Sequence, residues 1–169
     1  RSVVNQKPFV FNMSIRRNLD FVDKNIKHQI EACKKAGIHD FIETLPDGYN
    51  TVLRENGSNV SGGQKQMISI ARTILSDAEV LLFDDITTSL DPDTAKFVPK
   101  LIDNLKKDHT IIMITKKPEL MKTADKIVVL DHGKINDIGT HKQLIQTNEI
   151  YQMLQSRKSP SKIGVFDNV

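Results

Sequence analysis

The 169-residue sequence has no tryptophan and a single cysteine, Cys33, and no G-x-x-x-x-G-K-[ST] loop occurs in it. One cysteine cannot form an internal disulfide, so a disulfide-stapled scaffold is excluded and a reducing compartment is favoured. Apolar runs are far shorter than the roughly 20 residues that a bilayer-spanning helix needs. Without that glycine-rich loop, the sequence lacks the residues that cradle nucleotide phosphates in proteins that contain it.

Charge is nearly balanced, with 24 basic and 21 acidic residues and a net charge of +3. The lysines are scattered and are not interleaved with aromatic residues, so we expect no nucleic-acid partner. A composition of 38% hydrophobic and 27% charged residues is typical of a globular domain. The length is sufficient for one domain with a hydrophobic core, or for part of a larger one.

Short apolar segments bounded by polar residues predict three buried parallel strands, at 80–83, 111–114 and 127–130. Residues 2–4 predict a further strand, which we expect to be interrupted by the start of the chain, as in a fragment. Helical patterns lie between the strands, so an α/β fold with a parallel sheet is expected. The helix that begins at Asp91 and Pro92 continues towards residue 107, and Pro99 predicts a kink or a break inside it.

The segment before residue 60 differs from the rest. Residues 25–35 and 38–45 have helical periodicity, separated by Gly37, and no strand-like run occurs between residues 12 and 60. We therefore expect a small α-helical subdomain inserted into an α/β core. Two helices, around 142–146 and 149–155, close the fold, and the polar tail from residue 157 is expected to be flexible.

An anion-binding helix start is predicted at Ser61-Gly62-Gly63-Gln64. Ser61 is a good N-cap, and Gln64 three residues later completes a capping-box pattern. The two glycines leave backbone N–H groups open at the positive end of the helix dipole. A serine-capped glycine turn without a ligand explains the same residues when they are taken alone.

Polar residues follow three of the apolar strands. Asp84 and Asp85 end the strand at 80–83, Gln6 follows the opening strand, and Lys116 follows the strand at 111–114. Ligands bind at the carboxyl ends of strands in open α/β sheets, where Asp84 could hold Mg²⁺ through water and Asp85 could orient or deprotonate an attacking water. Loop capping by the two aspartates, and solvated loop positions for Gln6 and Lys116, are the alternatives.

In this order, the motifs resemble the nucleotide-binding domain of ATP-binding cassette (ABC) exporters over residues 1 to 155. Asn5-Gln6-Lys7-Pro8 resembles the Q-loop, the segment 60–66 the signature, Leu81 to Asp85 the Walker B strand, and Ser89-Leu90-Asp91 the D-loop. The resemblance implies a P-loop NTPase (RecA-like) core, truncated at its N-terminus, with ATP and Mg²⁺ as cofactors. Segments 45–49 and 55–57 resemble exporter regions that contact the membrane domain.

The resemblance also implies a role for each site residue. Asp85, Lys116 and Gln6 would be catalytic, and Asp84 and Gln6 would contact Mg²⁺. The residues implied in nucleotide binding are Ser61, Gly62, Gly63, Gln64 and Asp91. The implied segments are 1–8 (end of a core strand and Q-loop), 9–76 (helical subdomain with the signature), 77–156 (core with Walker B, D-loop and switch loop) and 157–169 (flexible tail).

Two departures from the family pattern lie at residues that would act on the ATP bound by this chain itself. The family usually has Glu at Asp85 and His at Lys116, whereas the signature is intact. Asp is shorter by one methylene, and Lys lacks the geometry of an imidazole. Arg54 also replaces a usual glycine, with no consequence that we can name.

Because two such domains pair head to tail in the family, Ser61, Gly62 and Gly63 would serve the partner's ATP. We therefore expect the weakly hydrolysing half of a heterodimeric exporter at the cytoplasmic face of the cell membrane, with a second nucleotide-binding domain and a transmembrane domain as partners. A homodimeric exporter ATPase that uses Asp85 as base, and a non-hydrolysing nucleotide-dependent scaffold, remain the alternatives. The 169 residues alone are expected to be inactive.

Overall fold

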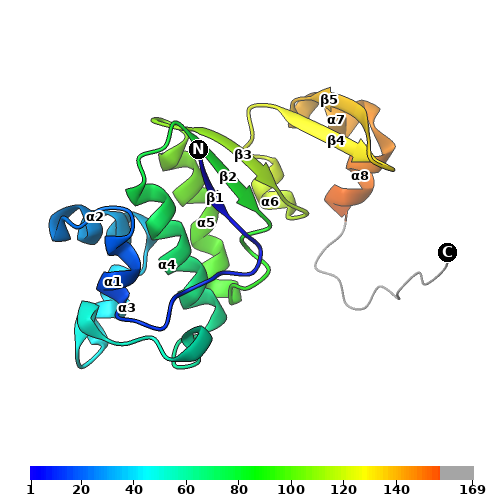
Figure 1. The fold of residues 1–169 in the computed structure, drawn as a ribbon. Coiled ribbons are helices and arrows are strands. Elements are labelled where there is room, and N and C mark those ends of the chain that lie inside the picture. The colour runs from blue at the N-terminus through cyan, green and yellow to red at the C-terminus, as the bar shows by residue number, and fades with distance from the viewer. Residues whose placement is uncertain (157–169) are drawn as a thin grey trace. The chain divides into compact units, whose positions relative to one another are not determined.

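The computed structural model describes residues 1–156, and these form two compact units, 1–115 and a second one that begins at Lys116. In the first unit, β1 (Ser2–Val4), β2 (Val80–Asp84) and β3 (Thr110–Ile114) form a parallel sheet in the order β1-β2-β3 (Figure 1). The predicted α/β class and three of the predicted strands are therefore confirmed. The predicted flexible tail lies outside the described residues.

The helical segment of the first unit follows β1. It contains α1 (Ile15–Asp20), α2 (Ile26–Ala36), α3 (His39–Thr44) and two single 3-10 turns, η1 (Gly48–Asn50) and η2 (Glu55–Gly57). Gly37 ends α2 in the left-handed conformation, with φ of 76°, as expected of a glycine that terminates a helix. A Cβ at Gly37 would lie 3.0 Å from the Phe97 ring, so another residue there would be strained by the positive φ and would require this ring to shift.

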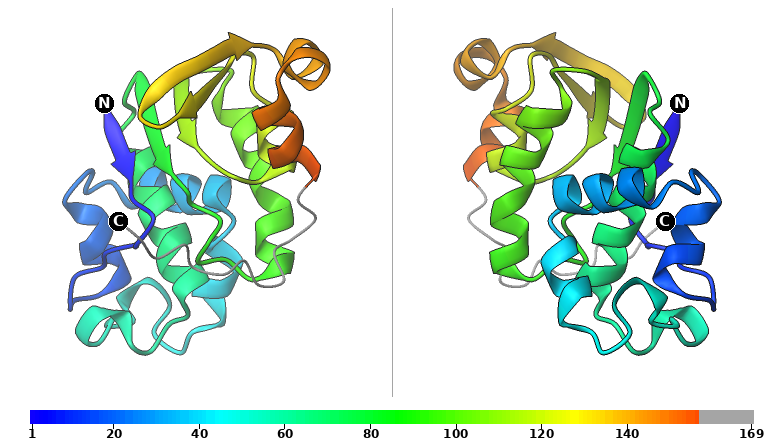
Figure 2. Two further views of the ribbon diagram at one scale, coloured as in Figure 1. Left: turned by 90° about the vertical axis from the view of Figure 1, so that its right-hand side faces the viewer. Right: turned by 90° about the vertical axis from the view of Figure 1, so that its left-hand side faces the viewer.

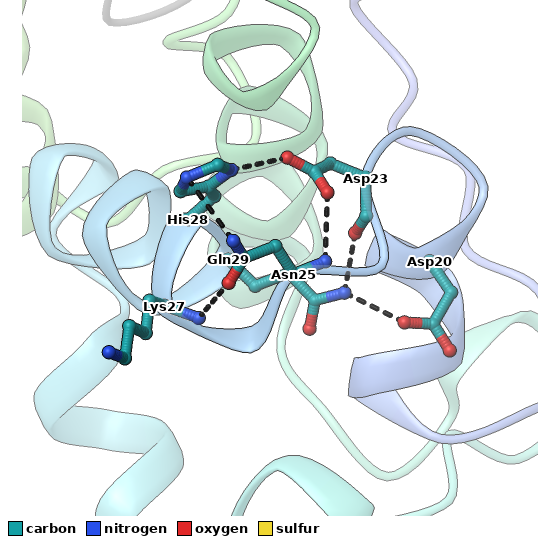
Figure 3. Close-up of polar contacts among 6 residues, drawn as sticks. All are labelled: Asp20, Asp23, Asn25, Lys27, His28 and Gln29. Carbon is teal, nitrogen blue, oxygen red and sulfur yellow. Dashed lines mark hydrogen bonds and ion pairs between the residues drawn. The ribbon is translucent and has the colours of Figure 1, made fainter.

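A polar network fixes the link between α1 and α2 (Figure 3). The buried Gln29 amide donates to Asp20 Oδ1 and to the Asp23 carbonyl, both over 2.7 Å. His28 Nδ1 lies 2.6 Å from Asp23 Oδ2, and the Asn25 side chain caps α2 by accepting from the Lys27 amide. The backbone amide of Asn25, and then the His28 side chain, hold the pKa of Asp23 below its usual range.

Helix α4 (Gly62–Leu75) connects the helical segment to the sheet. It packs against α1 and α2 on one side and against β1 on the other, and Figure 1 shows it between these elements. Its buried residues include Met67, Ile68, Ile70 and Ile74, so most of the helix circumference is covered. An element with contacts on both sides transmits displacements between the helical segment and the sheet, because a close-packed interior has few voids to absorb them.

Helix α5 (Pro92–Leu105) follows β2, begins after the N-cap Asp91, and continues through Pro99. The break that Pro99 predicted is therefore absent. An internal proline costs about 3 kcal/mol in a helix, but the buried side chains of Val98, Leu101, Ile102 and Leu105 anchor the helix on both sides of it. Burial of such side chains contributes about 1.5–3 kcal/mol each and outweighs the loss.

The second unit contains α6 (Pro118–Met121), β4 (Ile127–Asp131), β5 (Lys134–Gly139), α7 (His141–Thr147) and α8 (Glu149–Ser156). Its core is formed by Met121, Val129, Leu144 and Tyr151. His132 and Gly133, with φ of 47° and 75°, make the tight turn between β4 and β5.

The prediction of a parallel strand at 127–130 is wrong for the described residues. β4 pairs with β5 in an antiparallel hairpin, and the two strands form a sheet of their own. The primed turn at His132 and Gly133 folds the chain straight back, so pairing with the next strand in sequence requires no crossover. Val128 and Leu130 are 49% and 65% exposed, which also contradicts their expected burial.

The first unit's sheet is also less buried than predicted at β3. Ile112 and Ile114 of this edge strand are 55% and 65% exposed, whereas Leu81 and Phe83 of the central strand β2 are buried. Figure 2 shows β1 and β2 side by side. Because β2 also pairs with β3, it is the central strand of this sheet, and β1 and β3 are its edges. Within residues 1–156, no helix combines the length and apolarity that crossing a bilayer requires.

Candidate functional site

The ends of β1 and β2 bring Gln6 and Asp85 together. The two strands are parallel, with Val4 opposite Phe83, so the residues that follow them leave the same edge of the sheet. Gln6 Nε2 donates to Asp85 Oδ2 over 3.4 Å, although the two residues are 79 positions apart in the chain. This convergence was predicted from the strand ends and is confirmed for these two residues.

Asp84 and Lys116 lie at the ends of the two neighbouring strands. Asp84 is the last residue of β2, is exposed, and pairs in register with Ile114 of β3. Lys116 is exposed, follows β3 by two positions, and is the first residue of the second unit. That the Lys116 side chain lies close to Asp85 stays a prediction.

Asp85 is held by both its backbone and its side chain. Its φ of 41° is in the left-handed region, which is uncommon for residues other than glycine, although aspartate is among those enriched there. Its amide donates to the Ile114 carbonyl over 2.9 Å and so extends the β2–β3 pairing. Its carboxylate accepts from Thr88 Oγ1 at 2.7 Å and, more weakly, from Thr87 Oγ1 at 3.5 Å. Asp85 therefore caps its own loop and also faces Gln6.

The backbone around Gln6 is fixed from two further directions. Ser89 Oγ donates to the Gln6 carbonyl over 3.3 Å, and the buried Gln66 of α4 donates from Nε2 to the Asn5 carbonyl over 3.2 Å. Gln66 Oε1 is buried without a hydrogen-bond partner. Sequence reasoning missed both contacts, since neither donor stands directly at the end of a strand, where the pattern indicates convergence.

The start of α4 has the predicted capping box. Ser61 Oγ accepts from the Gln64 amide over 3.1 Å, and Gln64 Oε1 accepts from the Ser61 amide over 2.8 Å. The carbonyl side of the Gln64 amide is therefore used by the cap itself. Gly62 and Gly63 occupy the first turn, where their backbone N–H groups lack intrahelical partners.

The glycine turn lies against the loop that follows β2. A Cβ added at Gly62 would lie 3.5 Å from the Ser89 carbonyl oxygen, and one at Gly63 would lie 3.6 to 3.7 Å from Leu90, Ser89 and Asp91. These are ordinary van der Waals distances, so the fold itself does not require glycine at either position. The segment 85–91 thus reaches from Gln6 to the start of α4 within one unit.

Asp91 has a structural role in this arrangement. Its Oδ1 accepts from the amides of Asp93 and Thr94 over 3.1 and 3.0 Å, and its Oδ2 accepts from Thr94 Oγ1 over 2.6 Å. The Thr94 side chain, followed by the backbone amides, lowers the pKa of Asp91. Asp91 is therefore an ionised N-cap of α5, and its predicted role in nucleotide binding stays a prediction.

The carboxylates at the end of β2 fit a magnesium ion chemically. Mg²⁺ retains several waters and is held by one or two carboxylates together with substrate phosphates. Asp84 and Asp85 supply two adjacent carboxylates, and Gln6 adds an amide. Within residues 1–156, no group of three or more His, Cys, Asp and Glu could hold a metal ion. The site thus suits a hydrated magnesium nucleotide better than an ion bound by protein ligands alone.

Comparison with known proteins agrees with this geometry. Residues 1–88 match the ABC transporter family. The chain is 40% identical over 158 residues to the "ATP-dependent lipid A-core flippase" of Haemophilus influenzae (strain 86-028NP), covering 92% of this chain and 27% of that protein. It is 38% identical over 162 residues to "ATP-binding cassette sub-family B member 5" of Homo sapiens, covering 94% of this chain and 13% of that one.

A solved structure shares the fold. The structure titled "Structure of a bacterial Atm1-family ABC exporter with ATP bound" matches with a TM-score of 0.85 and 32% identity, covering 90% of this chain and 27% of that chain. The mixed α/β fold is thus that of an ABC ATPase of the P-loop class. The chain spans less than a third of the relatives named here. The match over residues 1–88 and the shared fold together establish that this chain belongs to the ABC transporter family.

Proposed function

We propose that the chain is part of an ATP-hydrolysing nucleotide-binding domain that drives an ABC exporter at the cytoplasmic face of a membrane. The observation that carries this proposal is the hydrogen bond between Gln6 and Asp85, beside the exposed Asp84, at the carboxyl ends of β1 and β2. The exporter assignment is supported by the relatives, whose names describe a lipid A-core flippase and an Atm1-family exporter.

Each residue of the site has a distinct task in this proposal. Asp84 holds the magnesium of the bound nucleotide, which neutralises phosphate charge. Gln6 and Asp85 orient a water, and Asp85 accepts its proton. Gly62 and Gly63 present the uncapped N–H groups of α4, and Ser61 presents its hydroxyl, to the ATP of a second nucleotide-binding domain, as the positive end of a helix favours anions.

The own site is proposed to hydrolyse ATP weakly, and the second domain is proposed to be a different chain. The reach of Asp85 is shorter than that of glutamate by one methylene, and misplacement by about 1 Å can cost on the order of 100-fold in rate. Thr88 and Gln6 already occupy Asp85 Oδ2. Lys116 carries a positive charge and three donors but no acceptor, so it cannot relay a proton as a neutral imidazole can.

An exposed aromatic cluster, Phe9, Phe11 and Phe21, is proposed as the contact with the transmembrane domain. Phe9 and Phe21 are 55% and 63% exposed. The rings of Phe9 and Phe11, and those of Phe11 and Phe21, are each 4.8 Å apart between centroids. The Arg72 guanidinium lies over the Phe11 ring and donates to the Phe9 carbonyl. An exposed apolar cluster of this kind marks an interaction surface, and it begins three residues after Gln6.

The proposed function is tested by measuring ATP hydrolysis by the full-length subunit that contains this chain, first alone and then mixed with its candidate partner subunit. We expect slow steady-state ATP hydrolysis by the subunit alone. A partner with Glu and His at the positions of Asp85 and Lys116 should increase the rate at least tenfold, because the rate then comes from the site that holds those residues.

Two other outcomes would replace this proposal. Rapid hydrolysis without a partner, abolished by Asp85→Asn, would establish a homodimeric ATPase that uses Asp85 as its base. Nucleotide-dependent dimerisation without any phosphate release, in either mixture, would establish a non-hydrolysing scaffold. Asp84→Asn serves as the control in each case, since loss of the magnesium ligand should weaken ATP-dependent pairing in all three.

A further inference from the structure

Thr88 donates the shortest hydrogen bond to the Asp85 carboxylate. Its Oγ1 lies 2.7 Å from Asp85 Oδ2, compared with 3.4 Å for Gln6 Nε2 and 3.5 Å between Thr87 Oγ1 and Asp85 Oδ1. Hydrogen bonds from a hydroxyl to a carboxylate are strong when they are this short. Thr88 therefore contributes most to the orientation of the carboxylate.

The two oxygens of Asp85 are held unequally. Oδ2 accepts from both Thr88 and Gln6, whereas the contact to Oδ1 is the weak one from Thr87. With Oδ2 fixed and the backbone at a φ of 41° tied to the Ile114 carbonyl, rotation of the carboxylate is restricted. Oδ1 retains free lone pairs for a water.

We propose that Thr88 is a positioning residue for Asp85, which fixes Oδ2 so that Oδ1 serves as the acceptor for the attacking water. This inference rests on the proposed function of Asp85. It assigns a task to a residue that the strand-end pattern did not single out. Thr88 and Asp85 belong to the same loop, three residues apart, so their hydrogen bond forms without a contribution from the partner domain.

A fixed carboxylate matters more for aspartate than for glutamate. Aspartate has one rotatable bond fewer, so an orientation set by Thr88 is transmitted directly to the position of Oδ1. Loss of the hydroxyl frees the carboxylate to rotate, and the fraction of time in the productive orientation falls. We expect this loss to affect the chemical step and to leave nucleotide binding unchanged, since the Thr88 hydroxyl is engaged with the Asp85 carboxylate.

Single-turnover ATP hydrolysis by the full-length transporter tests this inference in four variants, with the catalytic base of the partner subunit replaced so that only this chain's own site is followed. Thr88→Val removes the hydroxyl and keeps the shape, and Thr88→Ser keeps the hydroxyl. Asp85→Asn reports whether Asp85 is the base at all. Thr147→Val is the matched control, because the exposed Thr147 also donates from Oγ1, to the Gln143 carbonyl over 3.2 Å, at the end of α7.

We expect Thr88→Val to lower the rate constant about tenfold without changing the ATP concentration for half-saturation, a partial loss compared with the roughly 100-fold cost of a 1 Å displacement. Thr88→Ser should retain the parent rate, and Thr147→Val should match the parent. If Asp85→Asn lowers the rate and Thr88→Val does not, the positioning role is wrong while the proposed function stands. If Asp85→Asn has no effect, the proposed function itself is contradicted.

A second measurement examines the contact without nucleotide. Hydrogen–deuterium exchange of the peptide that covers residues 84–91 should accelerate in Thr88→Val and remain unchanged in Thr88→Ser. Equal exchange in all variants would show that the hydroxyl does not hold the loop and would overturn the inference, whatever the activity measurements give. Faster exchange in Thr88→Val alone would support it independently of catalysis.

Discussion

Gln6 Nε2 and Asp85 Oδ2 are 3.4 Å apart, and they join the ends of two parallel strands that are distant in sequence. The contact has a mechanical consequence, because Gln6 is also held through its carbonyl by Ser89. Ser89 in turn lies beside Gly62 and Gly63 at the start of α4. A displacement of the segment after β1 would therefore reach both the candidate base and the glycine turn.

Ser61→Ala should destabilise the protein by about 1 kcal/mol, the usual cost of losing a helix N-cap. Ser61 Oγ accepts from the Gln64 amide, and alanine has no side-chain acceptor for this bond. Urea unfolding followed by circular dichroism measures the change. Ser58→Ala, at an exposed position just before the same helix, should leave the unfolding midpoint unchanged. Equal midpoints for parent and Ser61→Ala would contradict the capping role.

Gly63→Ala should leave the unfolding midpoint within about 0.5 kcal/mol of the parent, the range of substitutions that break no specific feature. The added Cβ would make only ordinary contacts at 3.6 to 3.7 Å. In the paired transporter, we expect the same variant to weaken hydrolysis at the partner's site, since glycine permits the close approach of a ligand to the backbone and alanine restricts it. Thermal unfolding and partner-site turnover measure the two effects. Unfolding of the variant at a markedly lower temperature would mean that glycine is required by the fold instead.

Cys33 should resist alkylation in the folded protein. Burial raises the pKa of its thiol to about 11, partly opposed by a hydrogen bond with the Tyr49 side chain. Compared with the unperturbed value of 9.0, the thiolate fraction at pH 8 falls roughly 100-fold. Iodoacetamide labelling followed by mass spectrometry, with and without denaturant, gives the ratio of rates. Similar rates in both conditions would contradict the burial of this side chain.

Acid should remove the contribution of Asp23 to stability. The pKa of Asp23 is lowered in the folded protein by the Asn25 amide and by His28, so its charged form is favoured by folding. A depressed folded pKa gives stability that is present above the unfolded value of about 3.9 and is lost as the pH falls through the folded value. The difference in unfolding midpoint between parent and Asp23→Asn should be present at pH 5 and should shrink below about pH 4. A difference that grows as the pH falls would contradict the prediction that the ionised form of Asp23 stabilises the folded protein.

The sequence predicted those parts of the site that depend on local pattern or on strand ends. The capping box at Ser61 and Gln64 is local and was found from spacing alone. The meeting of Gln6 and Asp85 followed from the rule that parallel strands end at one edge. The contacts of Gln66 with Asn5, and of the glycine turn with Ser89, depend on the packing of distant segments, and no local signal indicates them.

In two places the fold differs from what the sequence pattern predicts. The apolar run at 127–130 resembles a buried parallel strand, yet the turn at His132 and Gly133 pairs it with its neighbour in sequence. Pro99 was expected to kink or break α5, and the break is absent because burial of Val98 and Leu101 on either side of it outweighs the lost hydrogen bond. For Thr88, the sequence indicated only a turn, since Asp, Thr and Ser side chains favour local hydrogen bonds in turns.

The central claim is that this chain's own site is weakened by Asp85 and Lys116. Single-turnover ATP hydrolysis by the full-length transporter, in the parent and in the Asp85→Glu/Lys116→His double variant, tests it most directly. In both measurements the catalytic base of the partner subunit is replaced, which removes the ATP hydrolysis at the partner's site. The account predicts a slow parent and a double variant that is faster by at least tenfold. A parent as fast as the double variant would show that Asp85 and Lys116 are fully competent, and would contradict the claim.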